Sequence, residues 1–494
     1  MRFGEGEREQ CPKFLGIRLD RTLCFKDHVE DVCERVIKRC GMLSCFASRA
    51  WGWKKKSLKR IYISMMRSIL DYAAAGWQPF LSPSQFSRLE VVQNRCLRAI
   101  TAQYANSSVE ILRLEADIPS YSTHSDQLTA IAYEKGKRLP TGHPRRDAVD
   151  DAVVHRSKVR SSFREKAEQL VSSLSIHDAP RDPITLSLPE FWNEPERNWT
   201  IHTNESIKHD IPAIKQLVES LDAEVNIYTD GSCKGGTSDG GAAAVVTTES
   251  FDEPQCVEVI KAKGDVHTSS YNEERRALNL GIGWLEDSPH VSHCAFLTDS
   301  LSLLQARDND HPETADIRGR LSNACTTIDL LYVPGHKDIP GNELADTHAK
   351  EAALIDGPPA NANISFETAK AIIRREIVDQ PTSHILASQA YSEVSQARDH
   401  AEITSRRDGG LLAQLRSGHH KCLGYYQHFV DPEISDLCQR CDMGETDDTE
   451  HWLTRCSATV AARQRIFGST DISMVELGRA PAKIIELAKS TLSL

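Results

Sequence analysis

The stretch VNIYTDGSC, residues 225–233, is an apolar run that ends in an Asp-Gly-Ser turn sequence at Asp230. Its β-branched and aromatic residues predict a strand with an aspartate at its end. Asp299 stands in the same position after the apolar run of residues 295–298. Because neighbouring strands lie about 4.8 Å apart, strand-end aspartates on adjacent strands would lie close together.

Two more acids fall on expected helices. Glu274 lies in a helix predicted over residues 269–285, and Asp346 lies in one predicted over residues 341–354. Carboxylates that gather this tightly repel one another unless a divalent cation lies between them. Hard oxygen ligands favour Mg²⁺ or Mn²⁺ over zinc. Two such ions can activate a water and stabilise the leaving oxygen of a phosphodiester, so the four acids predict a hydrolytic metal site.

Strand and helix signals alternate around these acids, which predicts a single α/β domain. The strands are expected at residues 225–233, 241–248, 257–263, 295–298 and 329–333. Two prolines, Pro358 and Pro359, end the alternation.

The order and spacing of these motifs resemble type-1 ribonuclease H domains. The matching segments are Thr229-Asp230-Gly231-Ser232, Gly240-Gly241-Ala242-Ala243, Ser269-Ser270-Tyr271-Asn272-Glu273-Glu274, Thr298-Asp299-Ser300, Val333-Pro334-Gly335-His336 and Gly341-Asn342-Glu343-Leu344-Ala345-Asp346. The resemblance covers residues 221–357 and implies a mixed five-stranded sheet flanked by helices. It also implies that the RNA strand of an RNA–DNA hybrid is cut by metal-dependent hydrolysis, without sequence specificity.

The resemblance assigns roles to individual residues. It implies that two Mg²⁺ or Mn²⁺ ions are held by four catalytic acids, namely Asp230, Glu274, Asp299 and Asp346. His336 would assist water activation or product release, since an imidazole can relay a proton near neutral pH. Glu273 and Glu274 are adjacent on one helix and point about 100° apart, so only one can face the site. The family register favours Glu274, and the choice stays open at this point.

The region before this domain is basic and helical. The first 140 residues hold 23 Lys and Arg against 15 Asp and Glu, although the whole chain has a net charge of −11. Apolar residues recur at helical spacing over residues 27–139, and Ser82 or Ser84 would cap a helix there. The positive charge suits a nucleic acid backbone, and equally suits an ordinary solvated surface.

Residues 1–139 resemble the end of the palm and the thumb in reverse transcriptases of LINE-type (non-LTR) retrotransposons. The resemblance rests on Lys13-Phe14-Leu15-Gly16-Ile17, Ala75-Gly76-Trp77 and residues 89–94; the alternative is an unrelated basic bundle. A complete reverse transcriptase is not expected, because its paired aspartates should precede Phe14 and only 13 residues are available there. The sequence Val149-Asp150-Asp151 follows the thumb-like helices and is interpreted as a chance match.

Prolines punctuate residues 140–220, which predicts a linker with limited structure and one helix near residues 156–174. Residues 358–416 are expected to be helical. Residues 417–494 are predicted to be a metal-binding module and tail.

This C-terminal module contains one tight pair of cysteines. A Cys-x2-Cys pair is followed by a histidine and a further cysteine, and the four candidate ligands are Cys438, Cys441, His451 and Cys456. Four soft ligands suit tetrahedral Zn²⁺ in a structural role. The segment resembles the terminal Cys-Cys-His-Cys segment of LINE-type polyproteins. The alternative is a helix with buried, reduced cysteines.

The composition limits the class of protein and the compartment in which it can be expected. The 494 residues are 40% hydrophobic and 26% charged, which is typical of a globular chain. No apolar run is long enough for a membrane helix, and the first residues lack the apolar segment of a secretory signal. The 14 scattered cysteines favour a reducing, intracellular compartment, either nucleus or cytoplasm. The oligomeric state is not indicated by the sequence.

We therefore expect a retrotransposon-derived endonuclease that hydrolyses RNA in RNA–DNA hybrids, with a basic N-terminal region that contacts nucleic acid. One alternative is a catalytically inactive remnant that only binds nucleic acid. Another is a two-metal nuclease of the integrase-like kind, which uses three acids in a different order and lacks the helix over residues 341–346.

Overall fold

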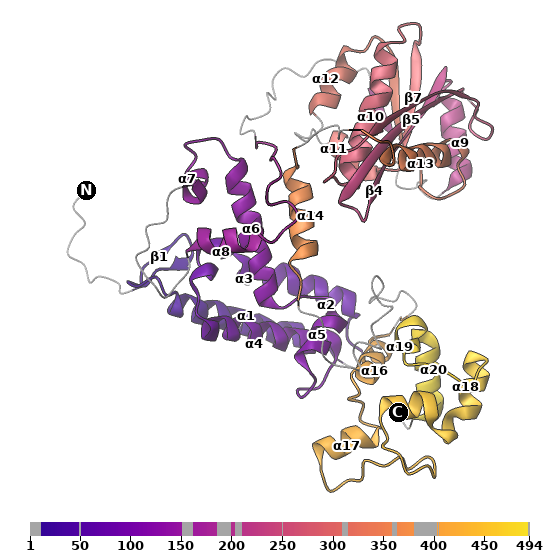
Figure 1. The fold of residues 1–494 in the computed structure, drawn as a ribbon. Coiled ribbons are helices and arrows are strands. Elements are labelled where there is room, and N and C mark those ends of the chain that lie inside the picture. The colour runs from indigo at the N-terminus through magenta and orange to yellow at the C-terminus, as the bar shows by residue number, and fades with distance from the viewer. Residues whose placement is uncertain are drawn as a thin grey trace. The chain divides into compact units, whose positions relative to one another are not determined.

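The computed structural model describes residues 11–48, 51–150, 162–184, 199–202, 210–248, 250–308, 315–357, 363–379, 403 and 405–492. The chain divides into two compact units, each of which is described by itself. The first unit comprises Met1–Thr129, Val153–Ala167 and Ile377–Leu494, and the second comprises Ala130–Ala152 and Glu168–Glu376. Figure 1 shows the elements of both units. No helix among the described residues combines the length and the hydropathy needed to cross a bilayer.

The second unit contains a six-stranded mixed sheet with the order β3-β8-β7-β4-β5-β6. Its strands are β3 (Trp199–His202), β4 (Val225–Lys234), β5 (Ser238–Thr247), β6 (Cys256–Lys263), β7 (His293–Thr298) and β8 (Thr327–Tyr332). Strands β4, β5 and β6 pair antiparallel, whereas β4, β7, β8 and β3 pair parallel. The mixed α/β fold is confirmed.

The number of strands differs from the prediction. Five strands were expected, and the sixth is β3, which lies in the segment predicted to be a linker. Trp199 of β3 is buried in the core of the sheet, and His202 contacts Asp329 of β8 at 2.7 Å. A strand of four residues carries too little alternation to be recognised between prolines. Residues 185–198 and 203–209 of the same segment lie outside the described residues.

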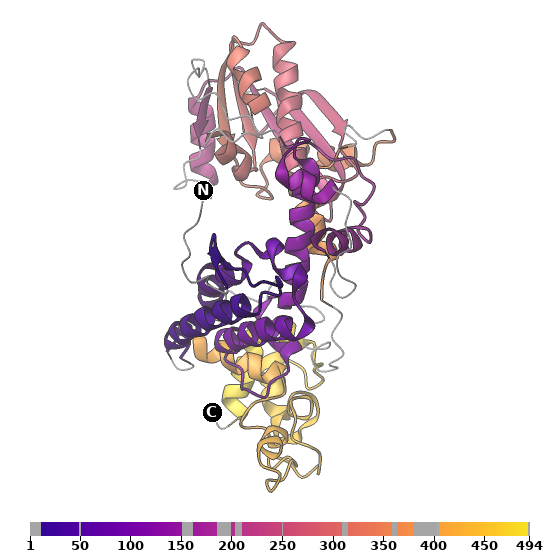
Figure 2. The same cartoon turned by 90° about the vertical axis from the view of Figure 1, so that its left-hand side faces the viewer.

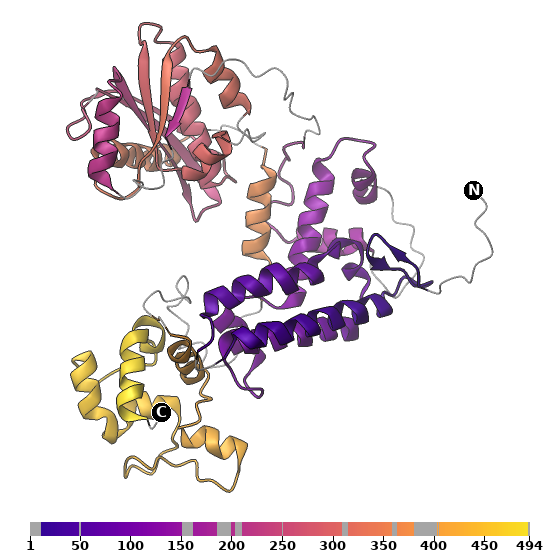
Figure 3. The same cartoon turned by 180° about the vertical axis from the view of Figure 1, so that it is seen from behind.

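Helices cover both faces of the sheet because its central strands are apolar on both sides. One face packs against α10 (Ser270–Glu286), α11 (Leu301–Asp308) and α12 (Ala315–Asn323) through Ile227 and its neighbours. The other face packs against α9 (Ile211–Ser220) and α13 (Pro340–Ala353) through Tyr228 and its neighbours. Figure 3 shows this layered arrangement.

Four more helices include residues of the second unit or border it: α6 (Tyr121–Arg138), α7 (Pro144–Asp150), α8 (Phe163–Val171) and α14 (Phe366–Glu376). Helix α8 lies within the helix predicted near residues 156–174, whereas α7 and α9 were not predicted, so the described part of the segment predicted to be a linker is more structured than expected. Residues Val149 and Asp150 lie on α7 rather than on a strand, which agrees with their interpretation as a chance match.

The first unit begins with a small hairpin of β1 (Lys13–Phe14) and β2 (Ile17–Arg18). A helical bundle follows, made of α1 (Lys26–Phe46), α2 (Lys55–Ile61), the π-helix η1 (Tyr62–Arg67), α3 (Ser68–Asp71), α4 (Pro83–Thr101) and α5 (Val109–Ala116). Helices α1 and α4 lie side by side around an apolar core (Figure 2). Ser82 caps α4 in a capping box with Gln85, as its sequence predicts.

The C-terminal helices of the first unit are α16 (Arg406–Arg416), α17 (Gly424–Val430), η5 (His451–Arg455), η6 (Ser457–Thr459), α18 (Val460–Phe467), α19 (Glu476–Arg479) and α20 (Pro481–Thr491). Their core includes Ile111 of α5, so they pack with the N-terminal bundle. Arg416 is fully buried and pairs with Glu115 at 3.1 Å. Helices α14 and α16 were expected in one region, and the structure places them in different compact units. The proposed domain boundaries stay predictions.

Candidate active site

Two neighbouring parallel strands place the predicted aspartates side by side. Strand β4 pairs with β7 in a register that sets Thr229 opposite Thr298. The next residues along these strands are Asp230 and Asp299, which therefore leave the same edge of the sheet together. Asp230 is buried, and Asp299 is partly buried.

Helix α10 brings a third carboxylate to this edge. Asp230, Glu274 and Asp299 each offer one oxygen atom, and these atoms lie within 4.8 Å of one another. The approach of α10 to β4 depends on Gly231, because a Cβ atom at this position would lie 2.2 Å from the backbone nitrogen of Glu274. Ser269 begins the helix by accepting a hydrogen bond from the backbone N–H of Asn272.

The electrostatics of this cluster disfavour three ionised carboxylates. Burial, followed by the charges of Asp299 and Asp346, raises the pKa of Asp230 from 3.8 to about 7. Burial and the charge of Asp230 hold the pKa of Glu274 well above its usual value. Burial also raises the pKa of Asp299, and the electrostatic interaction with His336 opposes that change. The cluster therefore has a strong affinity for positive charge, either protons or metal ions.

Asp346 and His336 form a second group beside the first. Together with Glu343 they offer ligand atoms within 4.8 Å of one another, and His336 is exposed. A Cβ atom on Gly335 would lie 2.3 Å from the Oδ2 atom of Asp299, so the loop that carries His336 packs directly against that carboxylate. The Nζ atom of Lys350 lies 2.7 Å from Asp346. Glu343 was not predicted from the sequence, because an acid in a first helical turn is common.

The two adjacent glutamates of α10 point in different directions. Glu274 faces Asp230 and Asp299, whereas Glu273 is buried elsewhere and accepts a hydrogen bond of 2.6 Å from the Thr268 hydroxyl. Arg276 pairs with Glu273 at 3.1 Å, which neutralises it. The geometry therefore favours Glu274 as the residue that belongs to the cluster.

The cluster fits a divalent cation. Its donors are carboxylate oxygens, which Mg²⁺ and Mn²⁺ prefer. The Oε2 atom of Glu274 is buried and has no hydrogen-bond partner among the described residues. A buried carboxylate oxygen without a partner is costly, and metal coordination would satisfy it.

The four predicted ligands of the C-terminal module also come together. Cys438, Cys441, His451 and Cys456 offer atoms within 4.8 Å of one another. The Sγ atom of Cys441 lies 3.4 Å from Nε2 of His451, and the Sγ atoms of Cys438 and Cys456 are 3.9 Å apart. On its other side, Nδ1 of His451 lies 3.0 Å from a carboxylate oxygen of Glu445. Such a carboxylate partner orients a metal-binding histidine.

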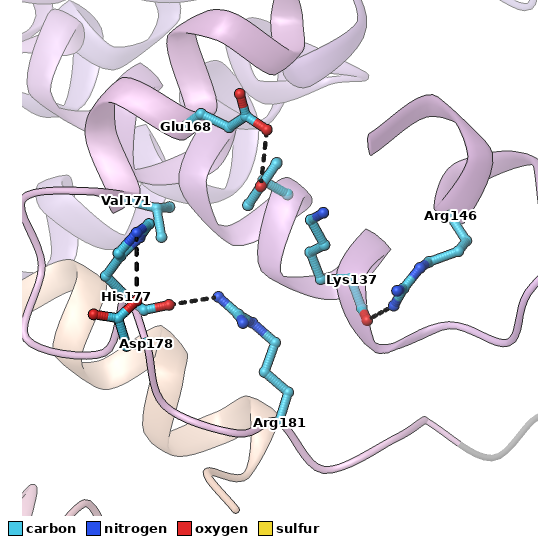
Figure 4. Close-up of a pocket in the computed structure, with 8 residues that line it drawn as sticks. Lys137, Arg146, Glu168, Val171, His177, Asp178 and Arg181 are labelled. Carbon is cyan, nitrogen blue, oxygen red and sulfur yellow. Dashed lines mark hydrogen bonds and ion pairs between the residues drawn. The ribbon is translucent and has the colours of Figure 1, made fainter. Parts of the chain in front are cut away.

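A separate cavity of about 480 Å³ lies in the second unit and shares no lining residue with these clusters (Figure 4). It is lined by Tyr133, Lys137, Arg146, Glu168, Val171, His177, Asp178 and Arg181. Its cations are already paired. Lys137 and Arg146 share Asp150, and Arg181 pairs with Glu134 at 2.9 Å. No residue of this cavity was predicted to be functional.

A family model for RNase H matches residues 222–354, the segment that carries the acid cluster. These residues form a ribonuclease H domain. The chain is also 30% identical over 89 residues to the probable RNA-directed DNA polymerase from transposon BS of Drosophila melanogaster. That match covers 18% of this chain and only 10% of the transposon protein. The family model confirms the predicted ribonuclease H domain, and the similarity to a transposon protein supports the predicted retrotransposon origin.

Several solved ribonucleases H are similar to the chain at low identity. LC11-RNase H1 in complex with an RNA/DNA hybrid is 16% identical, RNase H1 of Halobacterium salinarum is 18% identical, and the N-terminal RNase H domain of a Mycobacterium tuberculosis protein is 22% identical. The similar region covers 26%, 26% and 27% of this chain and 98%, 96% and 94% of theirs, each with a TM-score of 0.22.

Proposed function

We propose that the ribonuclease H domain hydrolyses the RNA strand of RNA–DNA hybrids with divalent cations. The observation that carries the proposal is the convergence of three distant carboxylates, Asp230, Glu274 and Asp299, within 4.8 Å. By family resemblance the cut is endonucleolytic and leaves a 5′-phosphate and a 3′-hydroxyl. Contacts with 2′-hydroxyl groups and with the sugar–phosphate shape would select the RNA strand, without reading its sequence.

Each residue has a proposed role. Asp230, Glu274 and Asp299 hold Mg²⁺ or Mn²⁺, with Asp346 as the fourth acid. When bound, two such ions activate the attacking water and stabilise the leaving oxygen. His336 lies on an exposed loop beside Asp299, so its ring is available to solvent and can move a proton during water activation or product release.

The alternatives are less consistent with these observations. An inactive remnant would be free to lose individual acids, yet all four acids and His336 are present. An integrase-like nuclease would lack the helix that carries Asp346, whereas α13 occupies that position. The basic N-terminal region is proposed to contact the nucleic acid backbone in addition to the nuclease site.

A cleavage assay tests the proposal. The full chain would be incubated with Mg²⁺ and four end-labelled duplexes: RNA–DNA with either strand labelled, DNA–DNA and RNA–RNA. We expect cleavage of RNA in the hybrid alone, and its loss in Asp230→Asn. Asp287→Asn, which removes an exposed acid at the end of the same α10, should cleave like the wild type. Intact hybrid after incubation with the wild type would favour the inactive remnant, and cleavage of DNA–DNA would favour the integrase-like alternative.

We also propose that the C-terminal module binds one structural Zn²⁺. Cys438, Cys441, His451 and Cys456 supply four soft ligands, which fill a tetrahedral site and leave no open position for catalysis. The hydrogen bond between His451 and Glu445 supports this proposal, because it fixes the ring with Nε2 directed at the cysteines. The role of zinc would be to stabilise a segment that has few regular elements of its own.

A further inference from the structure

The segment between Glu34 and Asp71 has an extreme charge pattern. Its 36 residues contain ten Lys or Arg and no Asp or Glu. Much of this charge lies between Lys54 and Arg60, at the start of α2. Lys55 and Lys59 pair with Glu115 and Asp117 of the same unit. Lys54 and Lys56 are exposed, so this segment presents positive charge to solvent.

Large aromatic side chains are exposed beside these lysines. Trp51 is 73% exposed, Trp53 is 49% exposed and Phe46 is 38% exposed. The rings of Phe46 and Trp53 stack with centroids 4.7 Å apart and an interplanar angle of 27°. Trp usually buries most of its surface, so two exposed tryptophans three residues or fewer from exposed lysines are a feature that requires explanation.

Backbone hydrogen bonds hold the segment that carries Trp53 in place. The backbone N–H of Trp53 donates to the carbonyl oxygen of Phe46 at 2.8 Å, and that of Gly52 donates to Ser48 at 2.9 Å. A Cβ atom at Gly52 would lie 2.3 Å from the Ser48 oxygen, so the turn depends on glycine. These contacts fix the backbone of Gly52 and Trp53, and stacking on Phe46 fixes the ring of Trp53, which Trp51 precedes by two residues.

We propose that this tryptophan–lysine surface, made of Phe46, Trp51, Trp53, Lys54 and Lys56, binds single-stranded nucleic acid. Exposed rings stack on unpaired bases of any identity, and neighbouring lysines neutralise the phosphates. A duplex is a poorer ligand, because its bases are already stacked on one another. A protein partner would suit the aromatic rings but not the two lysines, because aromatic residues are enriched and lysine is depleted in protein interfaces.

The surface rests on the proposed contact of the basic N-terminal region with nucleic acid and gives that contact its residues and its single-stranded ligand, but it does not depend on the proposed hydrolysis. It lies in the other compact unit from the acid cluster, and it would hold an unpaired strand irrespective of cleavage. Binding would be independent of sequence and would weaken as salt rises, because each neutralised phosphate releases counterions.

The test measures the affinity of the full chain for fluorescein-labelled oligo(dT) by anisotropy in EDTA, so that no cleavage is involved. We expect the double variant Trp51→Ala/Trp53→Ala to bind at least about tenfold more weakly, since stacking contributes about 1–3 kcal/mol per base. Trp51→Phe/Trp53→Phe keeps two aromatic rings and should retain most of the affinity. Thermal unfolding of each variant would show that the bundle is intact, as expected for exposed side chains.

The lysines are tested by salt dependence. The slope of log affinity against log salt should become shallower by about 1.4 in Lys54→Gln/Lys56→Gln, because two phosphate contacts are lost. Lys26→Gln is the matched control, since Lys26 begins α1 and lies roughly 30 Å along the helix from Phe46. Equal affinity of the alanine variant and the wild type would overturn the proposal. So would self-association of the wild type that Trp51→Ala/Trp53→Ala removes while oligo(dT) binding persists, because the surface would then bind protein.

Discussion

Replacing Asp230 by asparagine is expected to stabilise the metal-free ribonuclease H domain at alkaline pH. In the folded domain, burial and the charges of Asp299 and Asp346 raise the pKa of Asp230 from 3.8 to about 7. A carboxyl whose pKa is raised by folding binds its proton more tightly in the folded state. The Asp230 carboxyl therefore makes its full contribution to folding stability below pH 3.8, and this contribution is lost as the pH rises through about 7.

The raised pKa lowers the free energy of unfolding by about 4 kcal/mol once Asp230 is ionised, since one pKa unit is about 1.4 kcal/mol. In EDTA at about pH 8, Asp230→Asn should therefore raise the midpoint of thermal unfolding by up to about 10 °C. Near pH 5 the rise in the unfolding midpoint should be less than half as large, because Asp230 of the folded wild type is then protonated.

The assay is thermal unfolding of the wild type and the variant in EDTA and in excess Mg²⁺. Mg²⁺ should stabilise the wild type and have little effect on Asp230→Asn, because ligand binding stabilises only the form that binds. Asp287→Asn, an exposed acid at the end of α10, should follow the wild type throughout. A variant that is less stable than the wild type in EDTA at alkaline pH would refute the electrostatic reasoning.

Three further outcomes are expected. Cys441→Ser should lose bound zinc, as measured by metal analysis of the purified chain, and should unfold at a lower temperature; equal zinc content in both proteins would contradict the proposed site. Gly231→Ala should abolish hybrid cleavage and lower the midpoint of thermal unfolding, because its Cβ atom would meet the backbone of α10 and push Glu274 away from the cluster; full activity would show that this close approach is not needed. Arg416→Met should cost about 3–5 kcal/mol in denaturant unfolding, since it leaves Glu115 buried with less compensation, and a change below about 1 kcal/mol would be inconsistent with a buried pair.

The elements around the site were predictable because their signals are local. A helix was expected over residues 269–285, and α10 spans Ser270–Glu286 with Ser269 as its cap. The apolar run before Asp230 likewise predicted β4. Strand β3 was missed because its four residues gain their stability from pairing with β8, and that partner is distant in sequence.

The sequence could predict which residues belong to the candidate site, but not how their side chains are directed. Motif order singled out four candidate acids, but the choice between Glu273 and Glu274 required the positions of Thr268 and Arg276, which hold Glu273 away from the cluster. The exposure of Trp51 could not be predicted either. A tryptophan in a helical bundle is expected in the core, and only the fold shows that this one is not.

The proposed hydrolysis depends most on the binding of divalent cations by the converging carboxylates. Titration of the metal-free full chain with Mn²⁺, followed by electron paramagnetic resonance of the free ion, measures this directly. We expect tight binding by the wild type, a large loss in Glu274→Gln and near-normal binding in Glu273→Gln, because only Glu274 faces the cluster. Equal Mn²⁺ binding by Glu274→Gln and the wild type would contradict the proposal.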